Sequence, residues 1–394
     1  MGIAKKKDAT PALIPQKIFE VKSKSLNPIP IEKVLERLRV FAFNSSHFVW
    51  MISDFTFYET SNGWIFAISE HFGVNLVALE PLPPNHDFID QDFLDAVIEI
   101  QENLSEGAIA FISIGERFSS LLNKINYYSL QFGNEPWVDL SDFEPKGKRD
   151  RGLRAARNQA LKAGLQVEMK KLSDVINDPG LKKQVDALHR SWITETFLSL
   201  EGFLLKSDPW KLMDDRLCFI AKTPDNIISG VLLASPISLE SSWYFEDMWL
   251  SPARPKGAGE FLTLEAMGFL HAKGAKRVSL GVIPFNGLGF NHNSESVGFA
   301  KPLLFAACLK IFSSLLKIFY NAEGLNLFRK RFRVQVWSPT FMSVRTSPSN
   351  KRIRSFQWIQ VIIGLMIAHR PRFYFRALGR RALVVPEVSS SSEE

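Results

Sequence analysis

Two adjacent carboxylates and a basic, glycine-containing loop lie close together in the stretch 245–284. Glu246 and Asp247 end an apolar run, and Arg254 and Lys256 lie in the loop that leads into a helical pattern. A carboxylate can accept a proton from an attacking group, whereas basic side chains and the free N–H groups of a helix start bind anions. This combination is typical of group transfer from a large anionic donor.

We expect only one of the two carboxylates to reach the site. Side chains that are adjacent along a regular strand point to opposite faces of the sheet. We favour Asp247, either as the general base or as a ligand for an amino group. The alternative for Glu246 and for Asp247 is a carboxylate that only caps the loop.

The sequence around these residues predicts strands and a helix that position them. Apolar runs predict strands at 217–222, 227–236 and 242–250, then a helix at about 258–273 and a strand at 277–283. Three strands, a helix and a further strand is the order found in acetyltransferase-like folds.

The first half of the chain gives the same order. Short strands are expected between residues 55 and 79, a helix at 90–103 and a strand at 108–114, although no sequence repeat is visible. We therefore predict an α/β (α+β) chain with two tandem acetyltransferase-like (GNAT-like) domains and mixed, mostly antiparallel sheets. The expected divisions are a disordered leader at 1–30, an N-terminal domain at 31–166, a C-terminal catalytic domain at 167–345 and a basic, apolar tail at 346–394.

Composition limits the class of protein. The chain has 394 residues and a net charge of +7, and its two cysteines, Cys218 and Cys308, provide neither a disulfide framework nor a zinc-site spacing. Residues 324–386 contain thirteen Lys or Arg and no Asp or Glu, which suits RNA phosphates or anionic lipid head groups, or a solvated tail. No run of about 18 apolar residues is present, so we expect no spanning helix.

Two basic clusters are candidate phosphate sites. Arg154 and Arg157 lie three residues apart in a predicted helix at 150–163 and should share one face, as a phosphate-binding ridge or as a solvated basic surface. Arg329 and Arg331 alternate with aromatic residues in a segment expected to form a strand, where they would also share a face with Arg333.

Two apolar segments have two interpretations each. The pattern at 302–321 predicts an amphipathic helix that either lies on a membrane surface or packs in the core. The segment 356–367 is flanked by basic residues and is either an in-plane membrane anchor or a helix docked on the domain.

Several motifs resemble one family in the same order along residues 31–345. They are Gly147–Ala156, Glu201-Gly202-Phe203, Arg254-Pro255-Lys256-Gly257, Ser279-Leu280-Gly281-Val282-Ile283-Pro284, and Phe328–Phe332 with Trp337 and Pro339. Together they are similar to the C-terminal cytosolic domain of the lysyl-phosphatidylglycerol synthases, or aminoacyl-phosphatidylglycerol synthases. The resemblance also implies two acetyltransferase-like domains.

The resemblance implies transfer of an amino acid from aminoacyl-tRNA to the hydroxyl of a polar lipid such as phosphatidylglycerol, with no metal or other cofactor. Asp247 or Glu246 would assist proton transfer, and Glu201 would bind the ammonium group of the donor. The phosphate ligands would be Arg154, Arg157, Arg254, Lys256, Arg329 and Arg331. The enzyme would be cytoplasmic, peripheral to the inner face of the cell membrane, and would support resistance to cationic peptides.

The chain departs from the family pattern in two respects. The N-terminal membrane region of the family is missing, so a flippase role is not expected. Trp249 and Leu250 stand where the family usually has an arginine. Two other functions stay open: an acyl-CoA-dependent N- or O-acyltransferase on the same fold, and a non-catalytic membrane- or RNA-binding protein.

Overall fold

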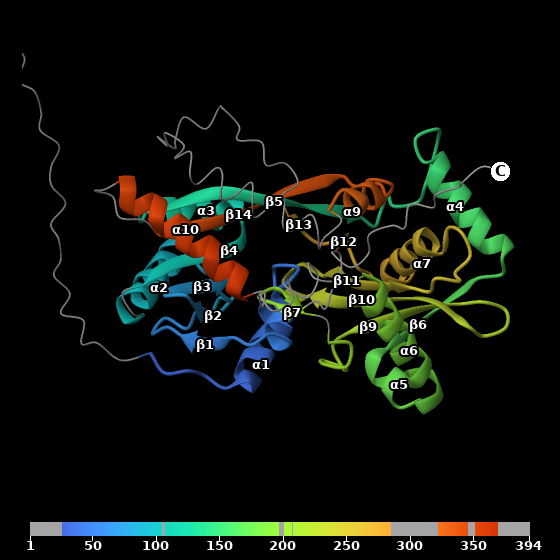
Figure 1. Ribbon diagram of the computed structural model, residues 1–394, viewed down its shortest axis with the longest axis horizontal. Helices are drawn as coiled ribbons and strands as arrows, with labels where there is room; N and C mark the ends of the chain where they lie inside the picture. The colour runs from blue at the N-terminus through green and yellow to red at the C-terminus, as the bar shows by residue number, and fades with distance from the viewer. Residues whose placement is uncertain are drawn as a thin grey trace, which may run out of the picture.

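The computed structural model describes residues 26–104, 107–196, 201–206, 208–284, 322–345 and 351–368. Twelve strands form one sheet, with helices on both faces (Figure 1). Along the sheet the strands follow the order β1 (Thr56–Glu59), β2 (Ile65–His71), β3 (Val74–Ala78), β4 (Ala108–Gly115), β14 (Val336–Arg345), β5 (Tyr127–Asp139), β12 (Arg277–Ser279), β11 (Ser242–Leu250), β10 (Ile228–Ile237), β9 (Leu217–Lys222) and β6 (Gln166–Lys171), with β13 (Ile283–Pro284) paired to β5 beside this path.

The same order of elements occurs twice along the chain. In the first unit, β1, β2 and β3 are antiparallel, and α2 (Asp90–Asn103) leads to β4, which runs parallel to β3. In the second unit, β9, β10 and β11 are antiparallel, and α7 (Ala258–Ala272) leads to β12, which runs parallel to β11. The remaining pairings among the described strands are antiparallel. The predicted tandem acetyltransferase-like architecture is confirmed.

Two long strands join the units into one sheet. β14, from near the end of the chain, pairs with β4 on one side and with β5 on the other. β5 then pairs with β12 and β13 of the second half. β5 can reach strands of both halves because it is one strand of 13 residues.

Helices cover both faces of each unit and bury four apolar clusters. On the first unit, α1 (Ile31–Phe41) and α10 (Lys351–Ala368) cover one face, and α2 and α3 (Glu116–Asn123) cover the other. On the second unit, α4 (Arg151–Lys162) and α7 cover one face, and α5 (Leu172–Ile176) and α6 (Pro179–Thr196) cover the other. The buried residues of α4 thus pack with the second unit, whereas β14 completes the first.

The apolar segment at 356–367 is docked on the first unit. It lies in α10, where Trp358, Val361, Ile362 and Leu365 are each at most 4% exposed and pack against strands of the first unit. Figure 1 shows α10 beside β3 and β4, although the helix comes from near the end of the chain. These side chains are unavailable to a membrane in this conformation. No helix in the described part of the chain is both long and apolar enough to cross a bilayer.

Two expected elements differ from the structure or fall outside it. The expected strand at 328–333 is the end of α9 (Ala322–Arg329) followed by a turn. The amphipathic pattern at 302–321 lies outside the described residues.

Candidate active site

A β-bulge brings Glu246 and Asp247 to the same face of the second unit. Asp247 is paired with Leu233 of β10 and Phe245 with Ala234, so Glu246 is the extra residue on β11. A bulge of this kind interrupts the strict alternation of side chains. The premise that these two side chains point to opposite faces is therefore wrong, and which of them takes part in the reaction stays a prediction.

Glu246 is held in a buried ion pair on the α6 face. Its carboxylate accepts hydrogen bonds from the hydroxyl of Ser235 and from the guanidinium of Arg216. Arg216, whose side chain is 1% exposed, also donates to the carbonyl oxygens of Asp208 at 2.8 Å and Lys211 at 3.2 Å. Burial raises the pKa of Glu246, and the charge of Arg216 acts in the opposite direction. Both partners of Glu246 were missed in the sequence, because they lie on other strands or loops.

Asp247 lies on the same face as Trp249, two residues further along β11, and is only partly buried. The imidazole of His189 from α6 packs on Trp249, with ring centroids 4.4 Å apart. Burial lowers the pKa of His189, while the charge of Asp247 opposes this shift. His189 is therefore near enough to Asp247 to feel its charge, and burial favours the uncharged form of the imidazole.

The loop between β11 and α7 is the expected basic helix start. Arg254 and Lys256 are exposed, and a guanidinium nitrogen of Arg254 donates to the carbonyl of Ser251 at 2.9 Å. Gly257 has φ +84°, and a Cβ at this position would overlap the carbonyl group of Ala156 in α4. The glycine therefore lets the loop pack directly on α4, with two cations at the start of α7.

The two arginines predicted to form a ridge on α4 have different partners. Arg154 donates to the carbonyl of Gly147 at 2.6 Å. Arg157 forms ion pairs with Glu144 at 3.0 Å and with Glu265 of α7 at 3.1 Å. Arg157 therefore links α4 to α7, and any phosphate would have to compete with two carboxylates for it.

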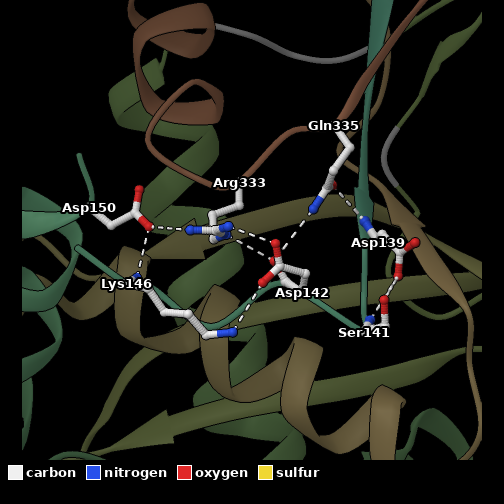
Figure 2. A network of polar contacts seen from close by, with 7 residues as sticks. All are labelled: Asp139, Ser141, Asp142, Lys146, Asp150, Arg333 and Gln335. Carbon is white, nitrogen blue, oxygen red and sulfur yellow. Dashed lines mark hydrogen bonds and ion pairs between the residues drawn. The ribbon is translucent and has the colours of Figure 1, made fainter. Parts of the chain in front are cut away.

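A polar network fixes the start of α4 to the segment that follows α9 (Figure 2). Arg333 donates to Asp142 at 2.6 Å and to Asp150 at 2.9 Å, and Asp150 also accepts from the backbone N–H of Lys146 at 2.8 Å. The hydrogen bond from Arg333 lowers the pKa of Asp142. Gln335 extends the network to β5 through the N–H of Asp139 at 2.8 Å. Arg333 is therefore a structural residue.

Arg329 and Arg331 do not share a strand face as expected. Arg329, the last residue of α9, donates to the carbonyl of Gly281 at 2.5 Å. Arg331 pairs with Glu260 in the first turn of α7, which places it near the basic loop. Glu201 lies in the two-residue strand β7 (Glu201–Gly202), which pairs with β8 (Leu205–Lys206), and only the backbone is described there.

The sequence from residue 38 to residue 344 matches a family model, described as phosphatidylglycerol lysyltransferase, C-terminal. The chain belongs to this family. No curated protein matches the sequence significantly. The family match spans both units and ends within β14, so it includes every candidate residue above.

Solved structures share the fold of this family member. The structure of L-PGS from Bacillus licheniformis has a TM-score of 0.69 at 18% identity, covering 89% of this chain and 100% of that one. The C-terminal domain of a putative lysylphosphatidylglycerol synthetase from Agrobacterium fabrum has a TM-score of 0.66 at 18% identity, covering 85% and 97%. A conserved protein of unknown function from Bacteroides thetaiotaomicron is more distant, with a TM-score of 0.56 at 11% identity and coverage of 81% and 99%.

Proposed function

We propose that this chain transfers an amino acid from aminoacyl-tRNA to the hydroxyl of phosphatidylglycerol or a similar polar lipid. The observation that carries the proposal is the family match across both units, combined with a partly buried carboxylate, Asp247, on the strand that leads into the basic helix start. Asp247 is the proposed general base because its side chain is only partly buried and is therefore accessible to a substrate, whereas Glu246 is held in a buried ion pair with Arg216.

The reaction is an exchange of esters. The lipid hydroxyl oxygen attacks the carbonyl carbon of the aminoacyl ester, and its proton passes to Asp247. The tetrahedral intermediate collapses when the bond from carbon to the ribose oxygen breaks, and that oxygen receives the proton. In the tetrahedral intermediate a negative charge develops on the carbonyl oxygen. Hydrogen-bond donors or cations close to that oxygen therefore lower the barrier.

Cations of the basic loop and of α4 are proposed to bind the donor. Arg254 and Lys256 lie at the start of α7, and Arg154 lies on α4, which packs against the same loop. An extended RNA backbone needs several exposed positive charges along its path. Arg331 would contribute after exchanging Glu260 for a phosphate, and Glu201 is proposed to bind the ammonium group of the amino acid.

A lipid acceptor requires contact with a membrane surface. We propose that the enzyme works at the inner, cytoplasmic face of the cell membrane, where product formation reduces the negative surface charge and supports resistance to cationic peptides. The attraction is proposed to be electrostatic, through the same basic surface and the acidic head groups. Salt should therefore weaken vesicle binding.

The test is a reconstituted transfer reaction. Purified chain is mixed with phosphatidylglycerol vesicles and, one at a time, with tRNAs carrying different radiolabelled amino acids, and labelled lipid is extracted. We expect one or a few amino acids to give a labelled lipid, and pretreatment with RNase to abolish it. In a parallel reaction, labelled acetyl-CoA replaces aminoacyl-tRNA. A labelled product formed with acetyl-CoA, and none formed with any aminoacyl-tRNA, would overturn the proposal in favour of an acyl-CoA-dependent transferase.

A further inference from the structure

A Ser-x-Gly segment lies at the end of the parallel strand of each unit. Ser113-Ile114-Gly115 forms the end of β4 in the first unit, and Ser279-Leu280-Gly281 begins at the last residue of β12 in the second. Each segment contacts a buried glutamate. Glu80 accepts a hydrogen bond from the N–H of Gly115 at 2.6 Å, and Glu135 of β5 accepts one from the hydroxyl of Ser279. The shared Ser-x-Gly pattern is only three residues long. It is recognised only when the two units are aligned by their order of strands and helices.

In the second unit, this contact is the first link in a chain of hydrogen bonds. The Ser279 hydroxyl donates to Glu135 and accepts from the N–H of Gly281 at 2.9 Å. The carbonyl of Gly281 in turn accepts from the guanidinium of Arg329 at 2.5 Å. Glu135 is therefore connected to Arg329 through the hydroxyl of Ser279 and the backbone of Gly281, whose N–H and C=O belong to consecutive peptide groups.

The backbone at Ser279–Gly281 has little freedom to adopt another arrangement. Gly281 has φ +83°, and a Cβ there would lie 2.8 Å from the ring of Tyr244 and 3.1 Å from a guanidinium nitrogen of Arg329. Glu135 and Ser279 are buried. A buried chain of hydrogen bonds resists rearrangement, because breaking one of its links leaves a buried polar group without that partner. The carbonyl that Arg329 uses is therefore fixed in direction.

We propose that Glu135 and Ser279 are positioning residues, which orient Arg329 through the Gly281 carbonyl to bind the phosphate of the lipid acceptor. This inference rests on the proposed function. Arg329 is partly buried, whereas Arg254 and Lys256 are exposed. A single phosphodiester suits one partly enclosed guanidinium, while an RNA backbone suits a row of exposed cations.

The main test compares two buried serines that each make a hydroxyl hydrogen bond to another side chain. Ser279→Ala breaks the chain to Arg329. Ser343→Ala removes the 2.6 Å contact with Ser129 within the first unit, away from Gly281. We expect similar, small falls in Tm for both variants. Only Ser279→Ala should raise the KM for phosphatidylglycerol, by about three- to tenfold, with kcat and the KM for aminoacyl-tRNA within about twofold of wild type.

A second pair of variants separates geometry from charge. Glu135→Gln keeps an oxygen that can accept from Ser279, so its KM for phosphatidylglycerol should stay within about twofold of wild type. Glu135→Ala removes the acceptor and should behave as Ser279→Ala does. An unchanged KM in Ser279→Ala, or an equal rise in Ser343→Ala, would overturn the positioning role. A rise in the KM for aminoacyl-tRNA instead would assign Arg329 to the donor and overturn the lipid assignment.

Vesicle binding distinguishes failure of this inference from failure of the proposed function. Sedimentation with phosphatidylglycerol vesicles, compared with phosphatidylcholine vesicles, requires no turnover. We expect weaker binding of Ser279→Ala than of Ser343→Ala to phosphatidylglycerol vesicles only. If wild type makes no aminoacyl lipid yet shows this difference, the positioning inference stands and the transfer reaction is wrong. Equal binding of both variants would reject the inference whether or not transfer occurs.

Discussion

The guanidinium of Arg216 and the carboxylate of Glu246 form an ion pair inside the second unit, with side-chain exposures of 1% and 9%. Removing one member of such a pair leaves an uncompensated buried charge. We expect Arg216→Met to destabilise the protein by about 3–5 kcal/mol in denaturant unfolding. The matched control is Arg117→Met, which breaks the exposed pair with Asp90 and should cost less than about 1 kcal/mol. Equal losses would contradict the structural role of Arg216.

The two adjacent carboxylates should separate into one catalytic and one structural residue. Asp247→Asn is expected to lower kcat for lipid aminoacylation by about 100-fold or more, with little change in Tm, because the proposed base is lost. Glu246→Gln should mainly lower Tm, because Arg216 loses its charged partner. Rates and melting curves measured on the same preparations decide between them. A large kcat effect confined to Glu246→Gln would reverse the assignment.

Gly257 should tolerate no side chain. Gly257→Ala introduces a Cβ that overlaps the carbonyl of Ala156, in addition to the strain of φ +84°. Gly274 has nearly the same backbone, φ +86°, and a Cβ added there would meet no atom within 4 Å, so Gly274→Ala isolates the strain, at about 1–2 kcal/mol. We expect a clearly larger loss for Gly257→Ala in denaturant unfolding. Similar losses would show that the contact between the loop and α4 is loose.

Glu80 should give the stability a pH dependence of known sign. Burial raises its pKa to about 7 in the folded protein, against the N–H of Gly115 and the amide of Asn44, which favour the charged form. The folded state therefore holds a proton that the unfolded state has lost between about pH 4.5 and pH 7, and stability falls as the pH rises through this window. Glu80→Gln removes this contribution.

The measurement is the free energy of unfolding of wild type and Glu80→Gln at about pH 5 and pH 8. We expect the difference, variant minus wild type, to become more positive by a few kcal/mol as the pH rises. The comparison offsets the contribution of His47, whose pKa burial lowers to about 4 and whose ring contacts the backbone carbonyl of Glu80, a group that the variant keeps. A difference that is independent of pH would show that Glu80 titrates normally.

Local patterns in the sequence were sufficient for the order of elements but not for their partners. The strand that carries Glu246, the basic loop and α7 were all predicted, because periodicity and glycine-proline signals are encoded over a few residues. The bulge at Glu246 was not predicted, since it depends on the pairing register between β10 and β11. Likewise, Arg216 is 30 residues from Glu246 in the sequence, and nothing local marks it as the partner.

The same limit explains the interpretations of the basic and apolar segments. In the sequence, Arg329, Arg331 and Arg333 resemble one cationic face. In the structure the chain turns after α9, so each arginine has a different partner. The partners are Gly281 for Arg329, Glu260 for Arg331, and Asp142 with Asp150 for Arg333. Hydrophobicity alone could not separate a membrane anchor from a docked helix for α10. That distinction depends on the exposed apolar surface of the first unit, which only the assembled sheet defines.

The insertion of β14 between β4 and β5 has a consequence for synthesis of the chain. The ribosome completes β4 at Gly115 but reaches Val336 only after more than two hundred further residues, which takes on the order of tens of seconds. Throughout that interval the first unit lacks the strand that pairs with β4 and the cover that α10 provides. Newly made chains therefore present an open sheet edge and an apolar surface to chaperones, and the N-terminal half reaches its final form after the C-terminal half has emerged.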